Sequence, residues 1–149
     1  MDVRVGEILP TPRHGKPVEI NAYWYNALRI MEALGRKAKA DGCGPDYGAL
    51  AEQVKRSFTE KFWDQERGCL KDVLSAMDLS RFNQSWAVTL PFTMLDRTTE
   101  RQIVETVFEK LYTPYGLRTL EAGDREFHPF YGGPMEERDM AYHQGTVWV

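Results

Sequence analysis

The richest group of chemically useful side chains lies in one short stretch, Thr11–Leu28, which reads TPRHGKPVEINAYWYNAL. The stretch opens as a loop stiffened by prolines and continues as a helix. Together the loop and the helix supply two cations, a carboxylate, two amides and an indole, which are Arg13, Lys16, Glu19, Asn21, Asn26 and Trp24. These groups are costly to bury together unless a polar ligand satisfies them. A sugar ring offers hydroxyls at its edge and a C–H face for stacking, so the stretch predicts a sugar site.

Further polar side chains lie downstream, at a helix start, in a loop and near the end of the chain. Asn83 and Gln84 open an apolar stretch, where adjacent amides indicate either helix capping or contacts in a sugar pocket. Arg118 lies in a loop, where it is either solvated or part of the site. Asp139 and His143 are four residues apart and share a face if the segment is helical. With no third ligand suggested, a sugar contact or a structural polar pair is favoured over a metal site.

Two residues of the first stretch also have a simpler interpretation. Trp24 falls on the apolar stripe of its helix, so it serves either the core or sugar stacking. Glu19 lies near a helix start, where the helix dipole favours a negative charge whatever else the residue does. Both interpretations stay open at this point.

Composition excludes several classes of partner. The 149 residues carry a net charge of -3 without a basic stripe, which disfavours nucleic acid. No window approaches the roughly 18 apolar residues of a membrane span, and no signal peptide is recognisable, so we expect a cytoplasmic protein. Cys43 and Cys69 are compatible with a disulfide or a metal pair, but two reduced thiols are favoured.

The spacing of apolar residues predicts two long helices in the first half of the chain. The first spans about Glu19–Ala40 and presents one apolar stripe, made of Ile20, Trp24, Leu28, Met31 and Leu34. The second runs from Asp46, a plausible N-cap, to Phe62. A loop with one short extended piece at Cys69–Leu74 follows.

The second half is predicted to hold two more helices and a long irregular segment. One short helix spans about Asn83–Leu90, and the next begins after Thr98 and Thr99, two N-cap candidates, and runs to Tyr112. The segment Thr113–Arg138 is rich in glycine and proline and is predicted to be irregular. A further helix is expected to start within Asp139–Val149. No 34- or 40-residue repeat is present, so antiparallel helix pairs indicate a helical toroid rather than a solenoid.

Four ordered motifs identify a family resemblance over nearly the whole chain. They are the TPR stretch, FNQ with SWAVTLPF from Phe82, YGLRTL from Tyr115, and YGG followed by RDMAYHQGTVW from Tyr131 and Arg138. In this order and spacing they resemble the C-terminal glucosidase domain of glycogen debranching enzymes, the amylo-α-1,6-glucosidases. The resemblance implies an all-α fold derived from an (α/α)6 barrel. About four to five of its twelve helices are expected within residues 1–149, which form a single partial domain truncated at both ends.

The resemblance also implies a mechanism and a set of site residues. Asp2 aligns with the family's proposed general acid, although the Thr-Trp that precedes that acid is absent. The family's general base lies downstream of the GTVW motif and is therefore expected to be absent from this chain. The family is inverting, and its two carboxyls stand ~6.5–9.5 Å apart with a water between them. The resemblance places the following residues in or around the sugar pocket: Arg13, Lys16, Glu19, Asn21, Trp24, Asn83, Gln84, Arg118, Asp139, His143 and Gln144. This chemistry needs no cofactor and no metal.

We therefore expect a fragment of an amylo-α-1,6-glucosidase, whose parent hydrolyses α-1,6-linked glucose at glycogen branch points. The chain alone is expected to have little or no activity. The alternative is a non-catalytic carbohydrate-binding or helical interaction module. A sugar epimerase on the same toroid is disfavoured, because His143 alone is suitably placed on a helix end. Helix faces that lack neighbours are expected to be covered by self-association or by a partner chain.

Overall fold

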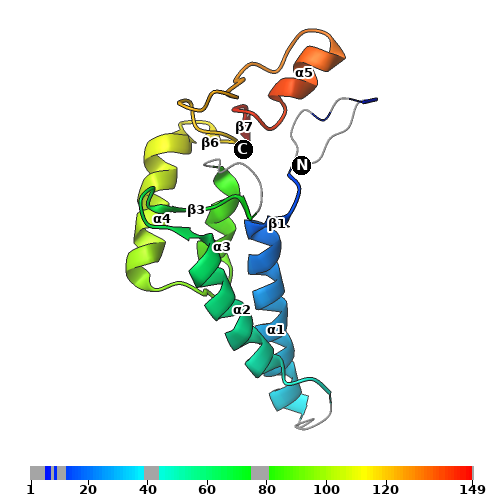
Figure 1. Ribbon diagram of the computed structural model, residues 1–149, viewed down its shortest axis with the longest axis vertical. Coiled ribbons are helices and arrows are strands. Elements are labelled where there is room, and N and C mark those ends of the chain that lie inside the picture. The colour runs from blue at the N-terminus through cyan, green and yellow to red at the C-terminus, as the bar shows by residue number, and fades with distance from the viewer. Residues whose placement is uncertain (1–5, 8, 10–12, 39–43, 75–80, 149) are drawn as a thin grey trace.

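The computed structural model describes residues 6–7, 9, 13–38, 44–74 and 81–148. Its longest feature is an antiparallel pair of helices, α1 (Val18–Ala38) and α2 (Tyr47–Phe62), which forms an arm of the molecule (Figure 1). Asp46 caps α2, because its side chain accepts a hydrogen bond from the backbone N–H of Ala49 at 2.9 Å. Both predicted helices and the predicted cap are confirmed.

Short strands follow α2 and bring the chain back toward the start of α1. β2 (Trp63–Asp64) pairs antiparallel with β3 (Cys69–Leu70). β4 (Val73–Leu74) then pairs with β1 (Lys16–Pro17), so that Lys16 lies opposite Leu74. The predicted extended piece at 69–74 is confirmed as two strands. Their pairing fixes the loop before α1 against a distant part of the chain.

The third predicted helix begins as a tighter turn. A 3₁₀ segment, η1 (Phe82–Ser85), leads directly into α3 (Trp86–Thr89). The fourth helix is α4 (Arg97–Leu111), and its predicted cap was wrong. Asp96 is the N-cap, since its carboxylate accepts the backbone N–H groups of Thr98 at 2.9 Å and Thr99 at 3.0 Å. A carboxylate one residue before the helix accepts these bonds better than a threonine hydroxyl within it.

The end of the chain differs from its prediction. β5 (Tyr112–Thr113), β6 (Gly116–Arg118) and β7 (Val147–Trp148) form one antiparallel sheet in that order. The helix predicted within 139–149 instead lies earlier, as α5 (Met135–Ala141). After α5 ends at Ala141, the chain turns through Gly145, whose φ is 130° and where a Cβ would meet the Phe127 ring at 2.5 Å. The segment predicted to be irregular thus contains β6 and the start of α5.

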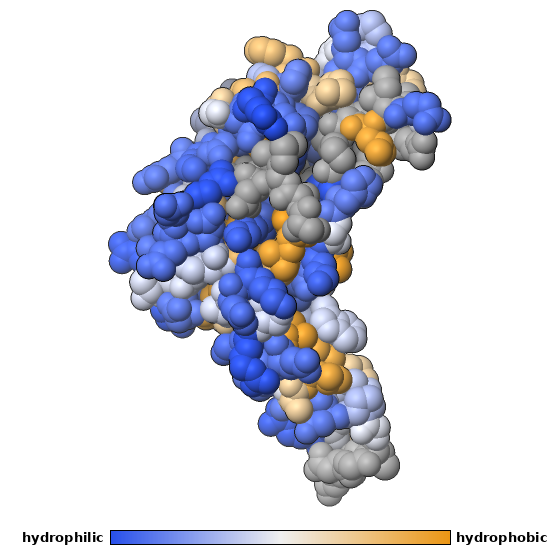
Figure 2. Space-filling view, in the orientation of Figure 1, coloured by the Kyte–Doolittle hydropathy of each residue, from blue (hydrophilic) through white to orange (hydrophobic). Residues whose placement is uncertain are grey.

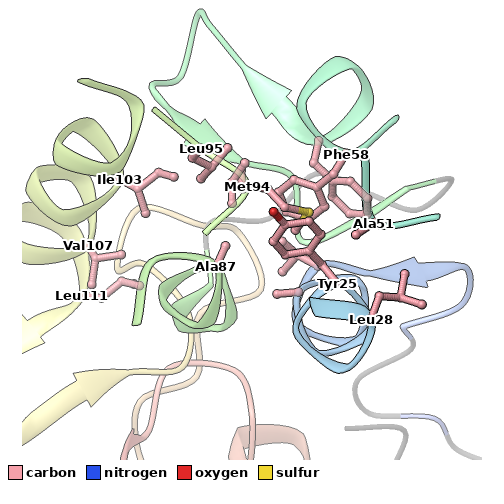
Figure 3. Close-up of a cluster of buried hydrophobic side chains, with 14 residues drawn as sticks. Tyr25, Leu28, Ala51, Phe58, Ala87, Met94, Leu95, Ile103, Val107 and Leu111 are labelled. Atoms are coloured by element: carbon pink, nitrogen blue, oxygen red, sulfur yellow. The ribbon is translucent and has the colours of Figure 1, made fainter. Parts of the chain in front are cut away.

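One hydrophobic core joins these elements, and Figure 3 shows its side chains converging from α1, α2, α3 and α4. From α1 the core takes Val18, Ala22, Tyr25 and Leu28. The predicted apolar stripe of α1 was therefore the wrong face. Its members Ile20, Trp24, Met31 and Leu34 are exposed, and Leu28 alone is buried. The helix is apolar on two faces, and periodicity does not say which of them meets the core.

The all-α prediction is confirmed as a mostly helical chain with short strand pairs. Membership of these helices in an (α/α)6 barrel stays a prediction. None of the helices in the described ranges is long and apolar enough to cross a membrane.

Candidate functional site

Arg13 lies at the centre of a buried polar network beneath the start of α1. Its guanidinium donates to both carboxylate oxygens of Glu19, at 2.6 and 2.8 Å. It also donates to both oxygens of Asp72, at 2.7 and 2.9 Å. Two bidentate pairs on one guanidinium are a strong arrangement, because the planar fork of arginine matches each carboxylate. They fix the end of the TPR loop to α1 and to the residue before β4.

Asp72 is a residue that the sequence analysis did not single out. It is the buried acidic residue of the described chain, with 3% of its surface exposed. Besides Arg13, its carboxylate accepts a hydrogen bond from the amide of Asn83 at 3.2 Å and lies 3.5 Å from the Nε of Arg81. Its backbone oxygen accepts the N–H of Val18 at 2.9 Å. Asp72 thus ties η1, β4 and the first residue of α1 together.

Arg81 carries the network to the last motif of the chain. Its guanidinium donates to the backbone oxygen of His143 and, at 2.6 Å, to the side-chain oxygen of Gln144. The amide of Gln144 in turn donates to Glu126 at 3.2 Å. Three motifs that lie far apart in the sequence are therefore joined by side chains within one buried cluster.

Burial and neighbouring charges shift the pKa values of three ionisable groups in the network. Burial acts to lower the pKa of Arg13, but its hydrogen bonds to Glu19 and Asp72 outweigh burial and raise that pKa. Burial lowers the pKa of Arg81, and the charge of Asp72 opposes the shift. Burial, together with the cations Arg81 and Arg13, lowers the pKa of His143 to about 4. His143 is therefore neutral at pH 7.

Gln84 is held by backbone groups on both sides. Its side-chain oxygen accepts the N–H of Leu70 at 3.1 Å, and its amide donates to the oxygen of Arg81 at 3.2 Å. With 1% of its surface exposed, Gln84 braces η1 against β3. Its assignment to the sugar pocket stays a prediction.

An open pocket lies beside the network, between α1 and α2, with a volume of about 290 Å³. Three predicted site residues line it, which are Lys16, Asn21 and Trp24. The opposite wall comes from α2 and β4, through Gln53, Val54, Ser57, Phe58, Lys61, Phe62 and Leu74. The described lining contains no acidic side chain. It combines apolar surface, an indole that is 55% exposed, two ammonium groups, two amides and one hydroxyl.

Comparison with known proteins identifies the family of this chain. A family described as Amylo-alpha-1,6-glucosidase matches residues 1–149. The chain belongs to this family. A glycogen debranching enzyme of Saccharomyces cerevisiae is 23% identical over 176 residues, an alignment that covers 93% of this chain. The chain spans 12% of the length of that yeast protein.

Nine of the predicted site residues fall into two groups. Six belong to the buried network or brace it, which are Arg13, Glu19, Asn83, Gln84, His143 and Gln144. Three line the open pocket, which are Lys16, Asn21 and Trp24. The two groups adjoin along the chain, because Lys16 follows Arg13 by three residues and Glu19 and Asn21 share the first turn of α1.

The other predicted residues lie elsewhere. Arg118, in β6, holds its guanidinium 5.5 Å from the centre of the Phe127 ring. Asp139 lies in α5 and is partly exposed. Asp2 lies outside the described residues.

Two further expectations concern the cysteines and possible metal ligands. Cys69 is buried, while Cys43 lies outside the described residues. Within the ranges that the structure describes, no three His, Cys, Asp or Glu side chains are grouped as metal ligands.

Proposed function

We propose that this chain forms the glucose-binding part of a domain that hydrolyses α-1,6-linked glucose at the branch points of an α-glucan. The observation that carries the proposal is the pocket between α1 and α2, which Lys16, Asn21 and Trp24 line. It adjoins the buried network that holds the loop of the same motif in place. A preorganised site binds more tightly, because its side chains lose less conformational entropy on binding.

The lining suits a sugar in both chemistry and size. Trp24 provides an exposed aromatic face for the C–H side of a glucose ring, while amides, a hydroxyl and ammonium groups are suited to its hydroxyls. The volume of about 290 Å³ lies at the small end of ligand pockets, which begin at roughly 300 Å³. We therefore assign it to one or two glucose units rather than to a long glucan chain.

Hydrolysis in this proposal is inverting and uses two carboxylates, one as general acid and one as general base. Asp2 is proposed as the acid, and the base is proposed to come from outside these 149 residues. Glu19 and Asp72 are assigned a different role. Both carboxylates accept bidentate hydrogen bonds from Arg13, so they position the loop rather than transfer protons.

A carbohydrate-binding module without turnover is the second candidate. It is favoured by the same contacts, because the two carboxylates nearest the pocket motif are both bound to Arg13. Sugar binding supports either candidate, and glucose release from a limit dextrin separates them. We expect binding with little release from the chain alone.

The test is calorimetry of the purified chain with isomaltose and maltose, comparing Trp24→Ala with the natural sequence. Since stacking on an aromatic ring contributes about 1 kcal/mol or more, we expect Trp24→Ala to weaken binding roughly tenfold. Trp86→Ala is the matched control, because it removes an exposed indole that does not line the pocket. A folded chain that binds neither sugar, or equal losses in the two variants, would overturn the proposal.

A further inference from the structure

The exposed face of α1 is entirely apolar over most of its length. Between Ile20 and Leu34, every exposed residue of the helix is hydrophobic. The set is Ile20, Tyr23, Trp24, Ala27, Ile30, Met31 and Leu34, and we call it the α1 seam. Figure 2 shows hydrophobic side chains gathered along the arm that α1 and α2 form. A contiguous patch of this kind on a soluble chain indicates an interaction surface.

The spacing of the seam identifies the shape of its partner. Ile20, Trp24, Ala27, Met31 and Leu34 follow one another at intervals of four, three, four and three residues. This period of 3.5 is the one that lets a helix keep contact with a second helix along its length. The surface that fits the seam is therefore another α-helix, lying nearly parallel to α1.

The seam is also symmetric about its middle residue. Ile20 and Leu34 are each seven residues from Ala27, Tyr23 and Met31 are each four, and Trp24 and Ile30 are each three. An antiparallel copy of α1 centred on Ala27 therefore places an apolar residue opposite every member of the set. Because Ala27 has the smallest side chain of the seven, it permits the closest approach at the two-fold axis. We propose that two copies of this chain associate through α1, antiparallel, with the axis at Ala27.

Area and charge agree with a second copy as the occupant. Covering the seven side chains buries on the order of 1,400 Å² over both copies, which lies within the range of stable interfaces. The flanks carry little free charge, because Arg29 pairs with Glu32 at 3.0 Å and Glu32 pairs with Arg36 at 2.8 Å. Antiparallel helices also place opposite ends of their dipoles together.

A second exposed apolar face, on α4 and the first residue of β5, fits a partner helix less well. Its members are Val104, Phe108 and Tyr112, and the last two rings already stack on each other at 4.9 Å. This face is shorter than the α1 seam and has no comparable symmetry. It therefore serves as the control surface for the experiments.

The first test is a disulfide at the two-fold axis. Helix axes about 8–10 Å apart bring facing Cα atoms to about 3.4–5.4 Å, which overlaps the roughly 4.4–6.8 Å that a disulfide spans. We expect Ala27→Cys to give a covalent dimer under mild oxidation, reversible by reductant. Val104→Cys, which is also an exposed position but on α4, and the natural sequence should stay monomeric on the same non-reducing gel. Absence of a dimer for Ala27→Cys, or equal yields for the two variants, overturns the arrangement.

The second test is the mass in solution, measured by sedimentation equilibrium at about 100 µM, a concentration where even a Kd in the µM range gives mostly dimer. We expect twice the chain mass of 17.2 kDa for the natural sequence. Leu34→Glu should halve that mass and Val104→Glu should not, since Leu34 and Val104 are both more than half exposed and neither supports the core. Circular dichroism checks that each variant is folded. A monomeric natural chain, or a larger assembly that Leu34→Glu leaves intact, contradicts the proposal.

Discussion

Asp72 determines how the motif residues of this chain are held. One carboxylate receives four hydrogen-bonding or ionic contacts from Arg13, Arg81 and Asn83, and none of these residues is its neighbour in sequence. Its own backbone oxygen fixes the first residue of α1. A buried charge with this many partners orders the elements that supply them, whatever its net contribution to stability.

Asp72→Asn should therefore be among the most destabilising isosteric changes in the chain. It removes the carboxylate that faces Arg81 and one of the two carboxylates that Arg13 binds. Removing one partner of a buried ion pair costs about 3–5 kcal/mol, and the retained Glu19 pair places this case near 3 kcal/mol. Urea unfolding measures the loss. Glu105→Gln is the matched control, since its pair with Arg101 is exposed, and a loss as large as that of Asp72→Asn would contradict the role assigned to the network.

His143 predicts how stability changes with pH. Its pKa falls to about 4 in the folded chain, chiefly through burial, against 6.5 for an unperturbed histidine. The unfolded state therefore binds the proton more tightly, so this residue lowers stability as the pH falls from 6.5 toward 4. Between pH 8 and pH 5 the expected loss is about 2 kcal/mol.

The variant His143→Gln isolates that contribution. It keeps the backbone oxygen that accepts from Arg81, and it removes the titrating ring. Urea unfolding at pH 8 and pH 5 should show a smaller decrease for the variant than for the natural chain. His128→Gln, which removes an exposed histidine, is the comparison variant measured at the same two pH values. A pH dependence unaffected by His143→Gln would show that the ring is not held neutral by burial.

At the scale of elements, the sequence predicted the positions of the helices, because these depend on residues close together in the chain. The positions of α1 and α2 follow from apolar spacing and from Asp46, whose capping bond spans three residues. The buried face of α1 did not follow, because the helix has two apolar faces and periodicity ranks neither. The core took the face of Val18 and Leu28, whose partners lie on α2, α3 and α4.

In the candidate site, too, contacts between neighbours in sequence could be predicted and contacts between distant residues could not. The motif residues of the TPR stretch were recognisable together because they are neighbours in sequence, and the structure keeps Arg13 and Glu19 in contact. Asp72 was missed because its contact with Arg13 spans 59 positions. A single acid between Lys71 and Val73 carries no pattern of its own. Pairing of β1 with β4 creates that contact, and two-residue strands leave almost no trace in a sequence.

At the scale of the whole molecule, one residue belongs to both surfaces that we assign a function. Trp24 lines the proposed sugar pocket and also occupies the α1 seam. In the antiparallel pair it lies opposite Ile30 of the partner subunit, so the second copy and the sugar compete for the same indole. Two ligands that share a binding group must weaken each other by the same factor.

The disulfide-linked Ala27→Cys dimer turns this competition into a measurable quantity. We expect the oxidised dimer to bind isomaltose several-fold to about tenfold more weakly than the same protein after reduction, because stacking on Trp24 contributes about 1 kcal/mol. Calorimetry with and without reductant makes the comparison on one sample, so folding and concentration are matched. By reciprocity, saturating isomaltose should shift the natural chain toward monomer in sedimentation. Equal affinities in the two redox states would contradict this competition. They would mean that the partner helix does not cover the indole of Trp24.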